Sequence, residues 1–160
     1  MIKREIKSII VDYNSPAELN DELQNLIQKA KSAAKKAYAP YSEFRVGAAV
    51  LLENNEIIEG NNQENAAYPS GLCAERVAIF YANSKYPNIE IKAIAITAIT
   101  KDGFIKEPIP PCGSCLQVML ESEQRANKPI QVLLFGTNKI TVAENIQQFL
   151  PIYFNKDMLK

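Results

Sequence analysis

The expected fold is decided by the stretch Ile91-Lys92-Ala93-Ile94-Ala95-Ile96-Thr97-Ala98-Ile99-Thr100. This run is almost continuously apolar and rich in β-branched residues. Such a run is typical of a central strand, because both of its faces must be covered by other elements. The run Ile130 to Phe135 has the same character and is followed by Gly136. We therefore expect two buried strands in a sheet with helices on both faces.

The segments on either side alternate between helical and extended patterns. Expected helices cover 19–37, where leucines, isoleucine and alanines recur at helical intervals, then 74–82, 116–120 and 142–149, and Ser15-Pro16-Ala17-Glu18 has capping-box spacing ahead of the first. Expected strands cover 46–52, 56–60 after a turn at Asn54-Asn55, and 139–142, with 5–11 as a candidate further strand. This alternation predicts an α/β fold, a three-layer α/β/α architecture with a mixed, mainly five-stranded sheet.

The composition indicates a single domain over residues 1–160, long enough to bury a core. Eighteen basic and eighteen acidic side chains cancel, which speaks against nucleic-acid partners because phosphate contacts demand a basic surplus. No run approaches the length of a membrane span, and the first residues lack a signal-peptide pattern. The odd number of closely spaced cysteines does not fit a secreted disulfide framework, so we expect a reduced, cytoplasmic protein.

All three cysteines of the chain lie in two short motifs, Cys73-Ala74-Glu75-Arg76 and Pro111-Cys112-Gly113-Ser114-Cys115, and the chain has no histidine. Both motifs precede helical patterns, so the cysteines are expected at helix N-termini. Unpaired backbone N–H groups and the positive end of the helix dipole stabilise thiolates there. The pattern predicts one zinc ion held by Cys73, Cys112 and Cys115, with Glu75 beside it.

Two other interpretations of the cysteines compete with this one. A redox Cys-x-x-Cys pair would leave Cys73 and Glu75 unexplained. A closed structural zinc site needs four protein ligands, so a carboxylate would have to complete it. An open fourth position taken by water is the more economical arrangement, and open sites are catalytic. Glu75 is then the candidate proton carrier, because zinc lowers the pKa of a bound water to about 7.

The joint pattern of Cys73-Ala74-Glu75 with Pro111-Cys112-Gly113-Ser114-Cys115 resembles the cytidine deaminases, in particular their small, three-cysteine, homotetrameric class. The likeness extends from about Ala37 to Phe154. Its further marks are Tyr38-Ala39-Pro40-Tyr41-Ser42, Phe44-Arg45-Val46-Gly47-Ala48-Ala49, Asn62-Gln63-Glu64-Asn65-Ala66-Ala67-Tyr68-Pro69, and Leu116-Gln117-Val118-Met119 after the second cysteine motif.

The resemblance implies roles for individual residues. Zinc ligands would be Cys73, Cys112 and Cys115, and the proton shuttle Glu75. Substrate-binding positions would be Phe44, Asn62, Glu64, Asn65, Ala66, Tyr68, Ala74 and Phe154, with Asn62 and Glu64 on the ribose and Phe44 on the pyrimidine. Arg76 and Gln117 would bond and tune the zinc thiolates. Phe154 would reach into a neighbouring subunit, which makes each active site composite.

The resemblance also implies a reaction. One zinc ion per chain would support hydrolytic deamination of cytidine and 2′-deoxycytidine to uridine and 2′-deoxyuridine, with release of ammonia, as part of pyrimidine salvage. The partners would be a free pyrimidine nucleoside and three further copies of the chain, without nucleic acid or membrane. The alternatives are deamination of another aminopyrimidine nucleoside and a non-catalytic zinc-binding module. Residues 1–18 form an N-terminal extension relative to the family, and the 101–110 loop is longer than expected.

Overall fold

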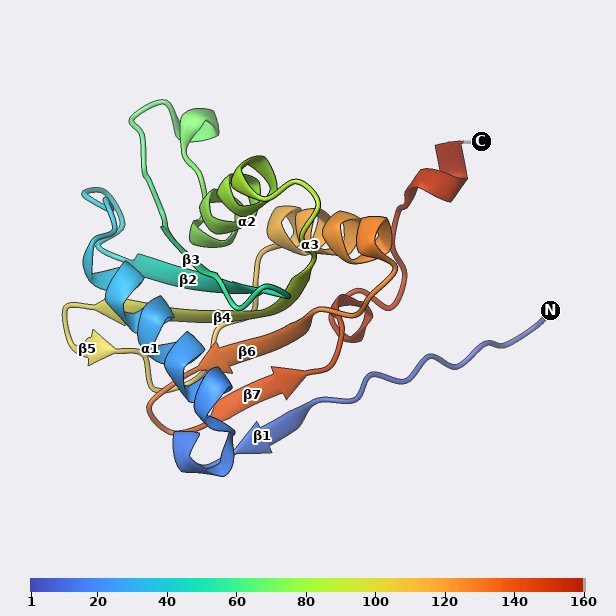
Figure 1. Cartoon of the computed structure of the whole chain (residues 1–160), viewed down its shortest axis with the longest axis horizontal. Helices are drawn as coiled ribbons and strands as arrows, with labels where there is room; N and C mark the ends of the chain where they lie inside the picture. Colours follow the sequence, from blue (N-terminus) through green and yellow to red (C-terminus); the bar gives the residue numbers. More distant parts are fainter. Residues whose placement is uncertain (160) are drawn as a thin grey trace.

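The computed structural model describes residues 1–159 of the chain (Figure 1). Within this part, seven strands form one mixed sheet: β1 (Val11–Tyr13), β2 (Arg45–Leu52), β3 (Ile57–Asn61), β4 (Ile91–Thr100), β5 (Gly103–Phe104), β6 (Gln131–Phe135) and β7 (Ile140–Ala143). The three α-helices are α1 (Asp21–Lys35), α2 (Ala74–Lys85) and α3 (Gly113–Ala126). Short 3₁₀ turns occur at Pro16–Glu18, Tyr68–Ser70, Ile146–Gln148 and Lys156–Leu159.

The sheet is arranged around β4, as its apolar sequence predicts. The strand order is β1-β7-β6-β4-β2-β3, and β5 pairs with the end of β4. β4 runs parallel to β6 and antiparallel to β2, while the other pairs in the sheet are antiparallel. The five longer strands are the five that the sequence predicts, and the two- and three-residue strands β5 and β1 extend the sheet to seven.

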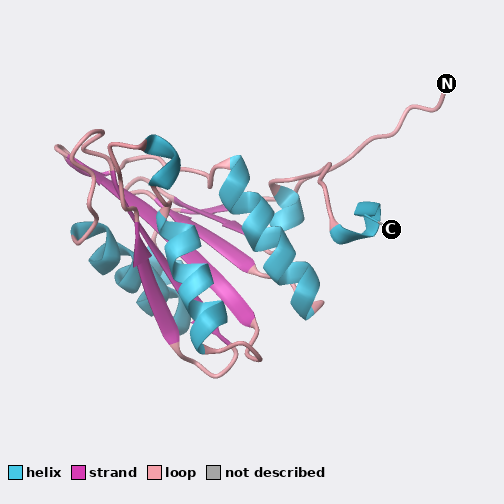
Figure 2. Cartoon of the chain, turned by 90° about the horizontal axis from the view of Figure 1, so that it is seen from above, coloured by secondary structure: helices cyan, strands magenta, loops and turns pink. Residues whose placement is uncertain are grey.

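The helices cover the sheet on both sides, which confirms the three-layer architecture. α1 lies on one face, and α2 and α3 lie side by side on the other (Figures 1 and 2). Each face has its own apolar core: Leu26, Ile27 and Ala30 of α1 belong to one, and Ile79 of α2 and Met119 of α3 belong to the other. The burial of alternate β4 side chains in the two cores explains why its sequence is almost continuously apolar.

Two local predictions are wrong. The capping box at Ser15 and Glu18 is formed, but it begins the 3₁₀ turn Pro16–Glu18 rather than the long helix. α1 has its own N-cap, because the Asn20 side chain accepts from the Leu23 N–H. The expected helix over 142–149 is also absent from the described residues, apart from the turn Ile146–Gln148. Pairing of β7 with β6 takes the residues up to Ala143, which leaves too short a segment for a helix.

The two ends of the chain leave the body of the fold on the same side (Figures 1 and 2). Residues 1–10 are exposed and carry no strand, so the candidate strand over 5–11 is limited to its last residue, where β1 begins at Val11. Among residues 1–159, no helix is long and apolar enough to cross a membrane.

Candidate metal centre and substrate pocket

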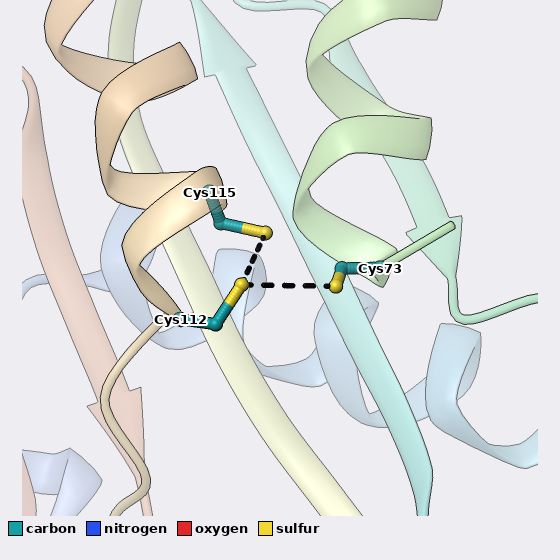
Figure 3. A group of neighbouring side chains, drawn as sticks. All are labelled: Cys73, Cys112 and Cys115. Carbon is teal, nitrogen blue, oxygen red and sulfur yellow. Dashed lines mark hydrogen bonds between the residues drawn. The ribbon is translucent and has the colours of Figure 1, made fainter. Parts of the chain in front are cut away.

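Three cysteines meet where α2 and α3 begin. Cys73 is the N-cap of α2 and Cys112 is the N-cap of α3, while Cys115 lies one turn into α3. The Sγ atom of Cys112 is 3.9 Å from that of Cys73 and 3.5 Å from that of Cys115 (Figure 3). All three sulfur atoms lie within 4.8 Å of one another. Residues far apart in the sequence therefore converge on one point, as the motif pattern predicts.

The donor set of this cluster suits zinc. Cys73 and Cys112 occupy the N-cap positions of two helices, where the positive end of the helix dipole favours the thiolate form. Thiolates bind zinc at about 2.3 Å in a tetrahedral arrangement, and three sulfur atoms this close together can surround a single ion. Three protein ligands leave room for a fourth, non-protein ligand, which is typical of a catalytic zinc site.

The electrostatics of the thiols depend on their proximity. Hydrogen bonding from Cys115, together with the Arg76 guanidinium whose Nη2 lies 3.4 Å from the Cys73 Sγ atom, lowers the pKa of Cys73 to about 5. The same hydrogen bond to Cys73, together with burial, raises the pKa of Cys115. Cys115 thus keeps the proton that stabilises the Cys73 thiolate. A divalent cation bound between the sulfur atoms would replace that proton and stabilise both thiolates.

Glu75 lies in the first turn of α2 and is 5% exposed. Burial raises the pKa of its carboxyl group, and the nearby Cys73 thiolate raises it further. A hydrogen bond with Cys115 acts in the opposite direction and places the carboxyl group against the thiol cluster. A buried carboxyl group beside a metal site can take and return a proton. This placement agrees with the predicted role of Glu75, which stays a prediction.

A cavity of about 480 Å³ opens beside the cysteine cluster. Its volume falls within the range of small-molecule sites. Its walls come from the loop before β2, the segment after β3 and the start of α2, and they comprise Tyr41, Ser42, Asn62, Gln63, Glu64, Asn65, Tyr68, Gly71, Leu72, Cys73 and Arg76. The predicted substrate positions Asn62, Glu64, Asn65 and Tyr68 thus share one pocket with a predicted zinc ligand. Phe44, Ala66, Ala74 and Phe154 are not among its lining residues.

Asn62 and Glu64 already form hydrogen bonds within the protein, most of them with backbone groups. The Asn62 amide donates to the Phe44 carbonyl oxygen (3.0 Å) and accepts from the Val46 N–H (2.8 Å). The Glu64 carboxylate accepts from the Tyr41 N–H at 2.9 Å and from the N–H and hydroxyl of Ser42. An amide offers two donors and two acceptor lone pairs, and a carboxylate about four acceptor positions, so both side chains keep capacity for a ligand.

Gln117 and Phe154, two of the predicted site residues, form a hydrogen bond with each other, and neither lines the pocket. Gln117, expected to bond the thiolates, instead donates from Nε2 to the Phe154 carbonyl oxygen at 3.0 Å. This bond ties the C-terminal segment to α3. The Phe154 side chain is 55% exposed, although a phenylalanine usually seeks burial. The roles predicted for Gln117 and Phe154 stay predictions.

Tyr41 and Ser42 also line the pocket, although no role was predicted for either residue from the sequence. The Tyr41 and Tyr68 rings stand edge to face across the pocket, with centroids 6.4 Å apart. The Ser42 hydroxyl reaches Glu64, which is 22 residues away in sequence. Their signal was present, because both lie in the motif Tyr38-Ala39-Pro40-Tyr41-Ser42. Only the folded loop shows that these side chains face the Asn62–Tyr68 segment.

Known proteins share both the sequence and the fold. Residues 20–128 match the family model described as the cytidine and deoxycytidylate deaminase zinc-binding region. A cytidine deaminase of Halalkalibacterium halodurans is 48% identical over 98 residues, which cover 61% of this chain and 70% of that protein. A cytidine deaminase of Sporosarcina psychrophila is 38% identical over 138 residues, which cover 86% of this chain and 95% of that protein.

Solved structures agree with these relatives. The crystal structure of a cytidine deaminase from Burkholderia pseudomallei has a TM-score of 0.69 at 37% identity, covering 81% of this chain and 97% of that one. A cytidine deaminase from Mycobacterium tuberculosis has a TM-score of 0.66 at 28% identity, covering 85% of this chain and 99% of that one. The family model, over residues 20–128, spans both helices that carry the cysteines. This chain therefore belongs to the cytidine and deoxycytidylate deaminase family.

Proposed function

We propose that the chain is a zinc-dependent enzyme that hydrolyses cytidine and 2′-deoxycytidine to uridine and 2′-deoxyuridine and releases ammonia. The observation that carries this proposal is a cavity of about 480 Å³ lined by Cys73, one of the three clustered cysteines, with the buried Glu75 two residues further along the chain. Relatives that cover most of this chain are named cytidine deaminases, which supports the substrate class.

The residues of the chain would divide the chemistry between them. Zinc, held by the three thiolates, supplies Lewis-acid activation of a water molecule. Glu75 takes a proton from the attacking water and delivers it to the ring nitrogen beside the carbon that carries the amine. Glu75 then carries the second proton of the water to the departing amine, so that water and cytidine become uridine and ammonia. Arg76 offsets the negative charge of the thiolates through its bond to Cys73.

Substrate binding would use the walls of the pocket. Asn62 and Glu64 bind the ribose hydroxyls with the hydrogen-bonding capacity that the loop leaves them. Phe44 and Tyr68 contact the pyrimidine ring, and the Ala74 backbone hydrogen-bonds to its polar edge. Asn65 continues this wall, and Ala66 follows it in sequence outside the lining. The sequence carries no net charge, which fits a free nucleoside better than a polynucleotide.

The test is ultraviolet-monitored turnover of cytidine and 2′-deoxycytidine by the zinc-loaded protein, compared with Glu75→Gln. We expect the variant to keep its fold and zinc content but to lose roughly 10²–10⁴-fold in kcat, the usual contribution of acid–base catalysis. Glu121→Gln, an exposed position on α3, serves as the matched control and should retain full turnover. Near-normal turnover in Glu75→Gln would refute the shuttle role. Absence of turnover in the zinc-loaded wild type would refute the function.

We further propose a cytoplasmic homotetramer with composite active sites. Large apolar side chains stay exposed on α2 and on the C-terminal segment, among them Phe80, Tyr81, Ile152 and Phe154. Exposed apolar patches of this kind mark interfaces between proteins. Sedimentation should give a tetramer, and Phe154→Ala should reduce kcat/KM without changing zinc content. A stable monomer with full activity would contradict the composite site.

A further inference from the structure

The loop before β2, residues 38–44, and the start of β2 form hydrogen bonds with two residues from another wall of the pocket, Asn62 and Glu64. The Tyr38 N–H donates to the Asn62 carbonyl oxygen (3.1 Å), and the Glu64 N–H donates to the Tyr38 carbonyl oxygen (2.9 Å). The Asn62 N–H donates to the Val46 carbonyl oxygen at 3.1 Å. The side chains of Asn62 and Glu64 add further bonds, because Asn62 accepts from the Val46 N–H and Glu64 from the Tyr41 and Ser42 N–H groups. Asn62 and Glu64, the two candidate ribose-binding residues, therefore also anchor the rim loop. A change in the position of the loop must affect ribose binding, and a change in either residue must affect the loop.

Ser42 contributes a side chain of the loop itself to this anchoring. Its hydroxyl oxygen accepts from the Phe44 N–H at 3.1 Å. Its hydroxyl proton is then free to go to Glu64 Oε1, which it contacts closely. Glu64 Oε2 meanwhile accepts from the N–H groups of Tyr41 and Ser42. The hydroxyl thus fixes both the turn of the loop and the orientation of the carboxylate.

The chemistry of the Glu64 carboxylate follows from these bonds. Donation from the Ser42 hydroxyl and then from the Tyr41 N–H lowers the pKa of Glu64, so the group is ionised at neutral pH and offers acceptor positions alone. Three of about four acceptor positions are occupied by the loop. Because Glu64 lines the cavity, the remaining position is available to a ligand bound there. Such a group binds a hydroxyl donor and repels an anion.

We propose that Ser42 is a positioning residue of the nucleoside pocket, which acts by aiming the Glu64 carboxylate at a substrate hydroxyl and by fixing the rim loop that carries Tyr41. This inference rests on the proposed function, because it assigns the hydroxyl to a nucleoside. Ser42 lies in the loop before β2 and Cys73 at the start of α2, and the Ser42 hydroxyl bonds to Glu64 and Phe44, so we assign Ser42 no part in proton transfer. Its loss should therefore weaken substrate binding much more than it slows the chemical step.

The first test is a double-mutant cycle on the zinc-loaded enzyme with cytidine. We expect Ser42→Ala to raise KM roughly fivefold to tenfold with kcat within about twofold, since uniform binding is lost. Ser42→Thr keeps the hydroxyl and should restore KM to within about twofold of wild type. Ser84→Ala removes an exposed hydroxyl from α2 and serves as the matched control with unchanged kinetics.

The Glu64→Ala background decides whether Ser42 acts through the carboxylate. There, Ser42→Ala should change kcat/KM by less than about twofold, because interacting residues are not additive. An equal loss of kcat/KM in both backgrounds would overturn the inference. An unchanged KM in the single variant Ser42→Ala would overturn it as well.

A second readout is independent of turnover. Hydrogen–deuterium exchange of the 38–46 segment should accelerate in Ser42→Ala, since the Phe44 N–H loses its acceptor and the Tyr41 N–H loses a fixed one. Exchange should stay at the wild-type rate in Ser42→Thr and Ser84→Ala. If the wild type does not deaminate cytidine, the proposed function fails while this measurement still decides the loop. Unchanged exchange in Ser42→Ala would then refute the positioning role.

Discussion

Substitution of Gly60 by alanine should separate the two helices that carry the cysteines. Gly60 lies in β3 directly beneath α2, and a Cβ atom there would be 2.5 Å from both the Ala74 carbonyl oxygen and the Ala78 nitrogen. Ordinary contact between such atoms needs about 3.5 Å, so α2 would have to move away from the sheet by roughly 1 Å. The obstacles are backbone atoms of the helix, which cannot turn aside as a side chain could.

The displacement has two measurable consequences. Overpacking of this kind costs about 2 kcal/mol, which lowers the melting temperature of a domain this size by about 4–8 °C. The movement also shifts Cys73, at the start of α2, relative to Cys112 and Cys115 on α3. Zinc–ligand distances tolerate only about 0.2 Å, so zinc affinity should fall roughly tenfold or more.

Thermal melting with and without zinc, together with zinc competition against a chromogenic chelator, measures both effects. Gly113→Ala is the matched control, because its added Cβ meets no atom within 4 Å outside its own helix backbone and chain neighbours, although the residue lies between two predicted zinc ligands in sequence. Wild-type melting and wild-type zinc affinity in Gly60→Ala would refute the close packing of α2 on β3. A loss of stability with unchanged zinc affinity would refute the proposed transmission to Cys73.

Two further predictions concern single side chains. Glu123 is buried and accepts from the N–H groups of Ile130 (2.9 Å) and Ile146 (3.0 Å), so Glu123→Ala should lower the free energy of unfolding by about 3 kcal/mol. The exposed control Glu121→Ala should change it little, and equal urea midpoints for the two variants would contradict this prediction. The pKa of Cys73 is depressed to about 5, so its thiolate predominates above that pH and is lost as the pH falls through it. In zinc-free protein the rate of Cys73 alkylation should therefore rise with pH, with a midpoint near pH 5. Arg76→Gln should move this midpoint upward, and an unmoved midpoint would show that Arg76 does not stabilise the thiolate.

Much of the fold could be predicted because the sequence pattern and the tertiary environment agree. The stretch Ile91–Thr100 forms β4 with the predicted bounds, since burial on two faces makes almost every position apolar. The helix expected over 142–149 fails because a short amphipathic run cannot reveal that its first residues pair with β6. The capping box at Ser15 is formed, but it begins a 3₁₀ turn, and α1 begins later because Asn20 supplies a separate N-cap.

In the site too, features marked by local sequence could be predicted, and features that depend on tertiary structure could not. The cysteine cluster could be predicted because both motifs begin helices, and helix starts are marked locally by Pro111 and by the apolar spacing that follows. The bond between Ser42 and Glu64 could not, because it depends on how a loop folds across a gap of 22 residues. The bond from Gln117 to the Phe154 carbonyl oxygen was equally hidden, since nothing local fixes the path of the C-terminal segment.

Titration of the zinc-free protein with zinc, followed by cytidine turnover at each step, tests the central claim most directly. The account predicts no turnover without metal, a linear rise, and a plateau at one zinc ion per chain. It also predicts that Cys112→Ala abolishes both tight zinc binding and turnover, because Cys112 lies between the other two sulfur atoms. Full turnover of the metal-free protein, or of Cys112→Ala, would contradict the account.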